Sequence, residues 1–271
     1  MNPFRLFGKR ALGTLNLFFR RRKYFRMERL REYSSKLLSR NAGALLIGGD
    51  LSTTSTNEEF AQARDFLNDL GYSPSNLHLV PGNHDVYTFK ASAEKRFEKH
   101  FAELIPREGY PCMTSMENGT PLLMLSTVCP NVFSSRGNIS EADIERVSEM
   151  LSAMDYVIVV VISHYPLLTE APEYNLSRSR RLQGAESLRN TLGACGSRVI
   201  YLCGHVHRFS SNVDPLFPNI HQITGPSFVG VSPKTGLGGG FVECTIGMSE
   251  YVVEHHFLTD EWNIESETHV I

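Results

Sequence analysis

The stretch Leu79-Val80-Pro81-Gly82-Asn83-His84-Asp85 joins an apolar run to a tight turn that carries an amide, an imidazole and a carboxylate. Three other stretches share this form, an apolar run followed at once by polar side chains: Leu46-Ile47-Gly48-Gly49-Asp50, Val160-Val161-Ile162-Ser163-His164 and Tyr201-Leu202-Cys203-Gly204-His205-Val206-His207. In open α/β sheets, ligands bind beyond the carboxyl ends of the strands. We therefore expect the four turns to converge on one site.

Apolar runs alternate with helix-like segments along the chain, which predicts an α/β fold. We expect strands at 44–47, 77–80, 121–127, 156–162 and 198–203, and helices at 26–40, 57–70, 91–104, 140–154 and 185–192. Beyond residue 203, strand-like runs at 220–224, 228–231, 240–246 and 251–257 predict a largely antiparallel C-terminal quarter. Two mixed β-sheets that face each other, with helices outside, accommodate both halves.

The composition is that of a globular domain, with 271 residues, 41% hydrophobic and 21% charged. The longest apolar stretch, 156–162, is far shorter than the roughly 20 residues that cross a bilayer. The five cysteines are scattered and lack the close pairing of a zinc knuckle, and no signal peptide is visible. We therefore expect free thiols and a cytoplasmic location.

The charge is unevenly distributed along the chain. Residues 1–40 hold 12 Lys/Arg against two acidic residues, a net +10, which leaves 15 Lys/Arg against 27 Asp/Glu, a net −12, in the remainder. Residues 1–26 interleave these cations with large apolar groups, and we expect this segment to lie on an anionic membrane surface in front of a domain at 27–271. Alternatively, the segment packs on the domain as a cap with a solvated basic rim. No nucleic-acid module surrounds it, so nucleic acid is not an expected partner.

The residue types in the four turns are those of a two-metal hydrolase for phosphate esters. Two divalent ions about 3.5–4 Å apart neutralise the ester and activate water, and oxygen and imidazole ligands suit Mn, Fe, Mg or Zn, of which we expect Mn²⁺. A carboxylate such as Asp50 can bridge two ions, whereas an amide oxygen such as that of Asn83 adds no charge. The imidazole ligands would come from three histidines: His164, His205 and His207.

Two residues of the Gly-Asn-His-Asp turn are candidates for catalysis rather than for metal binding. His84 directly follows the ligand Asn83, so it can reach the phosphate without occupying a metal. Asp85 could orient His84 or hold its protonated form.

Together these motifs resemble the calcineurin-like metallophosphoesterase superfamily, over residues 50 to about 257. The resemblance implies a sandwich of two mixed sheets flanked by helices. It also implies that Asp50 bridges the ions, that Asn83, His164 and His205 complete one ion, and that His207 belongs to the other. His84 would be the catalytic imidazole that assists the leaving group.

The chain departs from this family at its start. The family opens with an Asp-x-His strand that supplies two ligands to the ion of His207, yet residues 1–49 contain neither Asp nor His. Either the sequence is an incomplete gene model that begins at an internal Met, which we favour, or it is a degenerate member with one weakened metal site. In both cases we expect the first strand of the fold to be missing.

A second resemblance concerns the substrate. Asn2-Pro3-Phe4, the stretch 16–25, Thr53-Thr54-Ser55, Glu59-Phe60 and Tyr87-Thr88 resemble the branch that contains the UDP-2,3-diacylglucosamine pyrophosphatases of lipid A synthesis. That branch cuts a pyrophosphate in a membrane-embedded lipid. Three arginines in the polar insertion 165–183 could clamp the phosphate, or could be a solvated charge run: Arg178, Arg180 and Arg181.

Three functions therefore compete. The leading one is a metal-dependent hydrolase of phosphodiester or pyrophosphate bonds in a lipid-linked substrate at the cytoplasmic membrane face. The second is a soluble phosphoesterase of nucleotides or phosphoproteins. The third is a non-catalytic binding protein that keeps the fold with a degenerate metal site.

Overall fold

The computed structural model describes residues 25–131, 134–153, 155–175, 177–231 and 239–271. Of the basic segment predicted at 1–26, only Phe25 and Arg26 are described, so that prediction lies otherwise outside the described residues. Among the described helices, none combines the length and the apolar character needed to cross a bilayer.

A six-stranded mixed sheet forms the centre of the fold, in the order β3-β4-β6-β8-β10-β9. The four inner strands are parallel, and the two edge strands run antiparallel to their neighbours. The inner strands read as apolar runs because both faces of the sheet are covered. The strands are β3 (Cys112–Ser115), β4 (Pro121–Met124), β6 (Ile158–Ile162), β8 (Arg198–Cys203), β9 (Ser210–Val213) and β10 (Ile220–Thr224).

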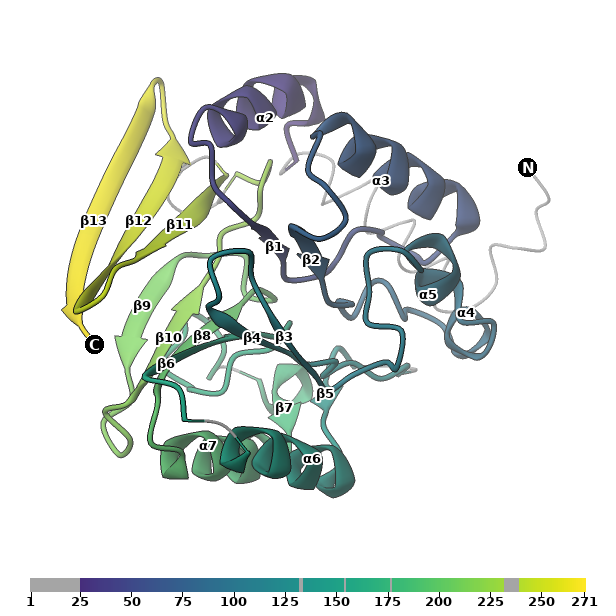
Figure 1. Ribbon diagram of the computed structural model, residues 1–271. Helices are drawn as coiled ribbons and strands as arrows, with labels where there is room; N and C mark the ends of the chain where they lie inside the picture. Colours follow the sequence, from purple (N-terminus) through teal and green to yellow (C-terminus); the bar gives the residue numbers. More distant parts are fainter. Residues whose placement is uncertain (1–24, 132–133, 154, 176, 232–238) are drawn as a thin grey trace.

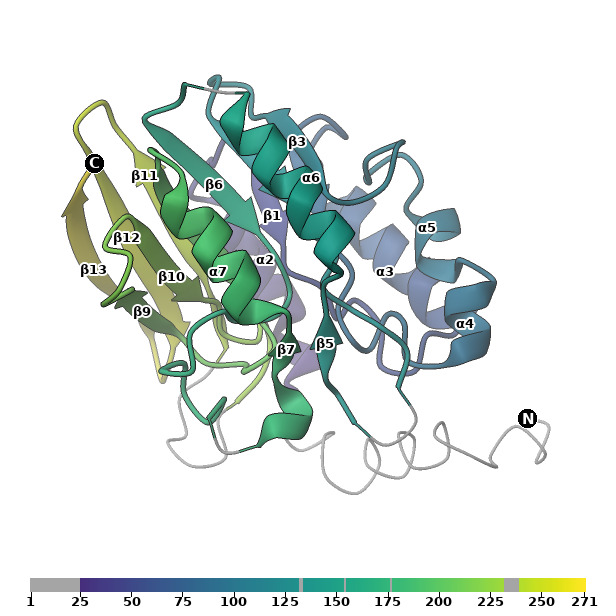
Figure 2. The same ribbon diagram turned by 90° about the horizontal axis from the view of Figure 1, so that it is seen from below.

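Helices α6 (Glu141–Ser152) and α7 (Ala185–Ala194) cover one face of this sheet (Figure 2). Their buried residues, among them Val147 and Leu188, form one apolar core with Val161 and Tyr201 of the sheet. Ser140 caps the start of α6 by accepting a hydrogen bond from the Asp143 backbone N–H. A short parallel pair, β5 (Gly137–Asn138) and β7 (Leu182–Gln183), lies beside these helices.

The other face of the six-stranded sheet packs against further β structure. The parallel pair β1 (Leu45–Ile47) and β2 (Leu77–Leu79) and the antiparallel sheet of β11 (Gly240–Ile246), β12 (Glu250–Leu258) and β13 (Trp262–Val270) make up this second layer. Leu122 and Ile200 of the large sheet share a core with Val80, which follows β2, and with Val253 of β12. The facing-sheet arrangement expected from the sequence is therefore confirmed.

The remaining helices lie outside this second layer (Figure 1). Phe60 of α3 and Phe97 of α5 pack on Leu79 of β2, and Tyr33 of α2 contacts Trp262 of β13 edge to face. The bounds of these helices are η3 (Met27–Arg29), α2 (Leu30–Leu38), α3 (Asn57–Asp69), α4 (Phe89–Ala93) and α5 (Arg96–His100).

Two predictions of secondary structure are wrong. The single helix expected at 91–104 is two short helices, because Lys95 takes a left-handed conformation with φ of 50° between them. The run 228–231 is no strand, since it contributes an isolated bridge between Gly230 and Phe25. The strands beyond residue 203 pair antiparallel with one another, as predicted, and β10 also pairs in parallel with β8.

Candidate metal centre

All five predicted metal ligands come together where β1, β2, β6 and β8 end. Asn83 lies between two imidazoles, with its Oδ1 3.1 Å from His164 Nε2 and 3.0 Å from His205 Nδ1. Asp50 Oδ2 lies 3.7 Å from His164 Nε2 and 4.0 Å from His207 Nε2. The Asp50 carboxylate thus lies between the histidine of one strand end and the more exposed histidine of another.

The orientation of His164 suits a metal ligand. His164 Nδ1 donates a hydrogen bond to the carbonyl oxygen of Gly48 at 2.7 Å, so Nε2 is the ring atom that faces the centre. This Nε2 lies 3.1 Å from the amide oxygen of Asn83 and 3.7 Å from Asp50 Oδ2. Carboxylate, amide and imidazole donors fit a divalent metal ion at this position.

The burial of His205 strengthens this interpretation. Its Nε2 is buried and has no hydrogen-bond partner among the described residues, while Nδ1 faces Asn83. Burial and the neighbouring His164 hold the pKa of His205 well below its usual range, so the ring is neutral and able to bind metal. Tyr165 packs against the ring, with centroids 4.3 Å apart.

The backbone is strained at the ligands themselves. Asp50, His205 and His207 have φ values of 63°, 65° and 59°, a left-handed region that residues other than glycine rarely adopt. Such conformations persist where the surrounding structure enforces them, and they concentrate at functional sites. In the Gly-His-Val-His turn, this geometry turns two histidines two residues apart toward the same centre.

Glycine allows the turns after β1 and β2 to touch. A Cβ on Gly49 would lie 2.3 Å from the Gly82 backbone nitrogen, and a Cβ on Gly82 would lie 2.2 Å from Asp50 Oδ1. Gly49 also has a φ of 96°. These two glycines therefore set how closely the Asp50 carboxylate approaches the Asn83 turn, where the His84 N–H donates to Asp50 Oδ1 at 2.8 Å.

Asp85 holds these two turns together rather than facing a substrate. It is 1% exposed, and its carboxylate accepts hydrogen bonds from the backbone N–H groups of Asp50, Ser52 and Gly82 at 2.8–2.9 Å. Ser52 Oγ donates to the same carboxylate at 3.0 Å. The sequence suggested a catalytic role for Asp85, but these contacts make it a positioning residue for the Asp50 turn.

His84 is oriented by a backbone carbonyl and an aromatic ring. Its Nδ1 donates to the Thr53 carbonyl oxygen at 2.8 Å, so Nε2 carries a proton only when the ring is cationic. The Tyr87 ring is stacked on the imidazole, with centroids 5.4 Å apart and planes 10° from parallel. Thr53 and Tyr87 lie outside the Gly-Asn-His-Asp motif, so the sequence did not identify them as residues that orient His84.

The three predicted substrate-binding arginines have different environments. Arg178 and Arg180 are exposed on the short 3₁₀ turn η4 (Arg178–Arg180). The charge of Arg180 contributes to the lowered pKa of His205, after burial and His164. Arg181 is less exposed, and its guanidinium donates to the Asn175 carbonyl oxygen of its own loop at 2.6 Å.

The sequence profile of the calcineurin-like phosphoesterases matches residues 23–209, which include all five predicted metal ligands. The chain belongs to this family. As a family member it is a metallophosphoesterase, a metal-dependent hydrolase of phosphoester bonds. No curated protein sequence matches the chain significantly.

Among solved structures, a dimetal phosphatase from Danio rerio matches this metallophosphoesterase with a TM-score of 0.64 at 14% identity, over 88% of each chain. A phosphopantetheinyl hydrolase from Mycobacterium tuberculosis matches 67% of this chain and 78% of its own, at 14% identity and a TM-score of 0.39. The first match supports the same fold.

Proposed function

We propose that the centre around Asp50 hydrolyses phosphodiester or pyrophosphate bonds with the help of two divalent ions, of which Mn²⁺ is the expected one. The observation that carries the proposal is the convergence of Asn83, His164 and Asp50, with the Asn83 and Asp50 oxygens 3.1 and 3.7 Å from His164 Nε2. When bound, the ions neutralise the ester and lower the pKa of water. In this proposal Asp50 would bind both ions, Asn83, His164 and His205 would hold one, and His207 would hold the other.

His84 is the residue that we assign to proton transfer. Because Thr53 fixes the proton on Nδ1, Nε2 is the atom that exchanges a proton with the leaving group. Stacking on Tyr87 limits rotation of the ring, which keeps Nε2 aimed in one direction. Asp85 acts further back, by holding the Asp50 and Gly82 turns together.

We further propose a lipid-linked substrate and a location at the membrane surface. The Phe25 ring, the end of the basic and apolar N-terminal segment, lies edge-on to the His207 ring with centroids 6.5 Å apart. A segment that binds anionic lipid would therefore bring the metal centre close to the bilayer surface. Arg180, which is exposed and whose charge helps to lower the pKa of His205, would bind the phosphate of the substrate.

Hydrolysis of bis-p-nitrophenyl phosphate, with Mn²⁺ and with the monoester for comparison, tests the reaction. We expect His84→Ala to keep the bound metal of the parent, measured by mass spectrometry, but to lose about 10²–10⁴-fold in rate. His164→Ala should lose metal and activity together. A folded, metal-loaded parent chain that cleaves neither ester would support the non-catalytic binding protein instead.

Sedimentation with liposomes tests the membrane proposal separately. At low salt we expect the chain to bind vesicles that contain anionic lipid and to be released by salt, since charge attraction to the surface is screened. The matched control replaces the four cations of residues 20–23 with serine and leaves the described domain unchanged. Equal sedimentation of both chains would contradict membrane attachment, while their hydrolysis of the soluble diester would remain comparable.

A further inference from the structure

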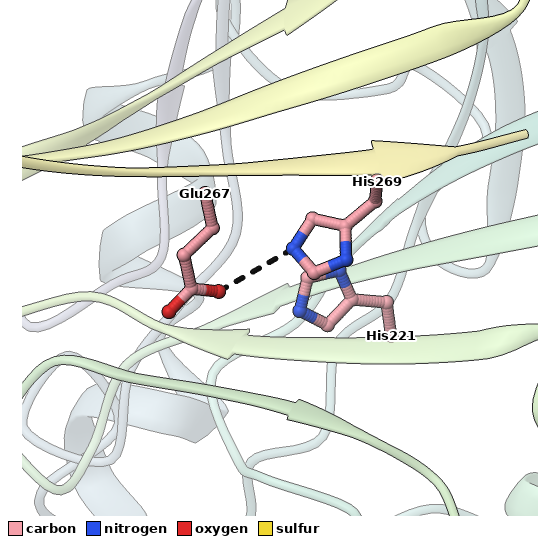
Figure 3. A group of neighbouring side chains, drawn as sticks. All are labelled: His221, Glu267 and His269. Atoms are coloured by element: carbon pink, nitrogen blue, oxygen red, sulfur yellow. Dashed lines mark hydrogen bonds and ion pairs between the residues drawn. The ribbon is translucent and has the colours of Figure 1, made fainter.

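A second cluster of metal-binding side chains lies between the two layers of β structure (Figure 3). His221 comes from β10, and Glu267 and His269 come from one face of β13. Each offers one ligand atom, and these three atoms all lie within 4.8 Å of one another. This cluster is separate from the Asp50 centre: His221 pairs with Ile200 inside the sheet, whereas His205 follows the carboxyl end of β8.

The geometry points to a zinc site formed by His221, Glu267 and His269, which joins the C-terminal strand to the central sheet. The distance from Glu267 Oε2 to His269 Nε2 is 3.3 Å. This equals the separation of about 3.3 Å between two ligands of a tetrahedral ion with bonds near 2.0–2.1 Å. Two imidazoles and one carboxylate are a common ligand set for Zn²⁺.

The surroundings of His221 prepare its Nε2 for a metal. The side chain is fully buried, and its Nδ1 lies 2.7 Å from the Tyr251 hydroxyl, an acceptor that can hold the Nδ1 proton. Tyr251 also stacks on the His269 ring, with centroids 5.1 Å apart and planes 18° from parallel. One tyrosine thus orients both imidazoles.

Ser211 of β9 adds an oxygen to the cluster. Its hydroxyl donates to Glu267 Oε2 at 2.6 Å, and the same oxygen lies 2.7 Å from His221 Nε2. Because the Ser211 hydroxyl donates its proton to a hydrogen bond with Glu267, a lone pair of the serine oxygen faces His221 Nε2. That oxygen could therefore also bind a metal ion. The competing arrangement places a proton on His221 Nε2, which gives a closed chain of hydrogen bonds and needs no metal.

Another cluster of carboxylates and a histidine shows how the protein can balance such charges without a metal ion. Glu243, Glu254 and His256 also lie close together, but the Arg40 guanidinium contacts both carboxylates, at 2.5 and 3.0 Å. A cation is therefore already present there. Around His221 and Glu267, the described contacts from outside the cluster are to the hydroxyl groups of Ser211 and Tyr251. Glu267 is about half exposed, so an ion can enter from solvent.

Zinc titration by calorimetry in an Asp50→Asn background, which weakens the phosphoesterase centre, tests the site. We expect His269→Ala and Glu267→Gln to weaken the remaining zinc binding at least about tenfold. The matched control is Glu265→Gln, an exposed residue of the same strand. Replacement of zinc by Co²⁺ should give the visible bands of a tetrahedral ion, and His269→Ala should abolish them.

The thermal midpoint gives a second readout that does not depend on hydrolysis. Zinc should raise the midpoint of the Asp50→Asn chain and of its Glu265→Gln form, but not that of the His269→Ala form, because a ligand of the folded state stabilises it. The alanine variant changes a side chain that is partly exposed, so it should fold, as circular dichroism would verify. Equal zinc affinity in all four chains would overturn the proposal in favour of the hydrogen-bonded chain.

Discussion

The turns that follow β1 and β2 can touch only because residue 82 is a glycine. Replacing Gly82 with alanine should therefore disable the metal centre. The new Cβ would lie 2.2 Å from Asp50 Oδ1 and 2.3 Å from the Asp50 backbone nitrogen. Real Cβ atoms are essentially never found below 3.0 Å from such atoms, so Asp50 or its turn must move by about 0.8 Å. Asp85 bonds both turns and so resists their separation. The residue that is displaced is therefore Asp50, the proposed bridging ligand.

A misplacement of about 1 Å costs roughly 10²-fold in rate when it affects the reacting geometry. We therefore expect Gly82→Ala to lower the hydrolysis rate of bis-p-nitrophenyl phosphate by about that factor and to weaken metal binding in calorimetry. Overpacking should also lower the free energy of unfolding by about 1–3 kcal/mol, measured with urea. All three effects have one steric cause.

Gly48→Ala is the matched control for this experiment. Gly48 lies two residues before Asp50, yet a Cβ there would meet its nearest neighbour, the Ser163 carbonyl oxygen, at an ordinary 3.6 Å. We expect this variant to bind metal and hydrolyse the diester as the parent does. If Gly82→Ala matched Gly48→Ala in metal affinity and rate, the proposed role of the Asp50 carboxylate would be refuted.

Three further predictions concern the substrate and the stability of the domain. Arg180→Ala should raise KM about tenfold with little change in kcat, measured by steady-state kinetics. Arg181→Ala should instead lower the free energy of urea unfolding, because the Arg181 guanidinium donates a hydrogen bond within its own loop. If Arg181→Ala raised KM and Arg180→Ala lowered stability, Arg181 would be the substrate-binding residue. Burial raises the pKa of Asp214, but Arg189 and two backbone N–H donors outweigh burial and leave it below the ordinary value. The folded-state pKa is thus below the unfolded one, so this stability is present above about pH 4 and is lost as the pH falls through the folded-state pKa. Asp214→Asn should cost about 2 kcal/mol at pH 7 and reduce the acid dependence of urea unfolding, and an unchanged pH profile would contradict this. Thr56→Ala should cost about 1 kcal/mol by removing the capping box of α3, whereas Thr56→Ser should not.

The sequence predicted the layers well because burial leaves a direct mark on a strand. The five residues of β6 are all apolar, and such a run has few alternatives to a buried strand. By contrast, β13 went unpredicted because most of its residues are exposed and polar, so that it holds no apolar run. The break at Lys95 was also invisible, since a single left-handed residue leaves no periodic signal.

The amino-acid sequence by itself determined the chemistry of the metal centre. Each strand-end turn carries its ligands within a few residues, and their types alone indicate divalent ions and phosphate esters. Only the tertiary structure decided how these parts work together. It made Asp85 a link between two turns. It also brought His221 beside Glu267 and His269, which lie on a strand that is distant in the sequence. The physical reason is that ligand type is a local property, whereas hydrogen-bond partners and neighbouring strands depend on packing between segments far apart in the chain.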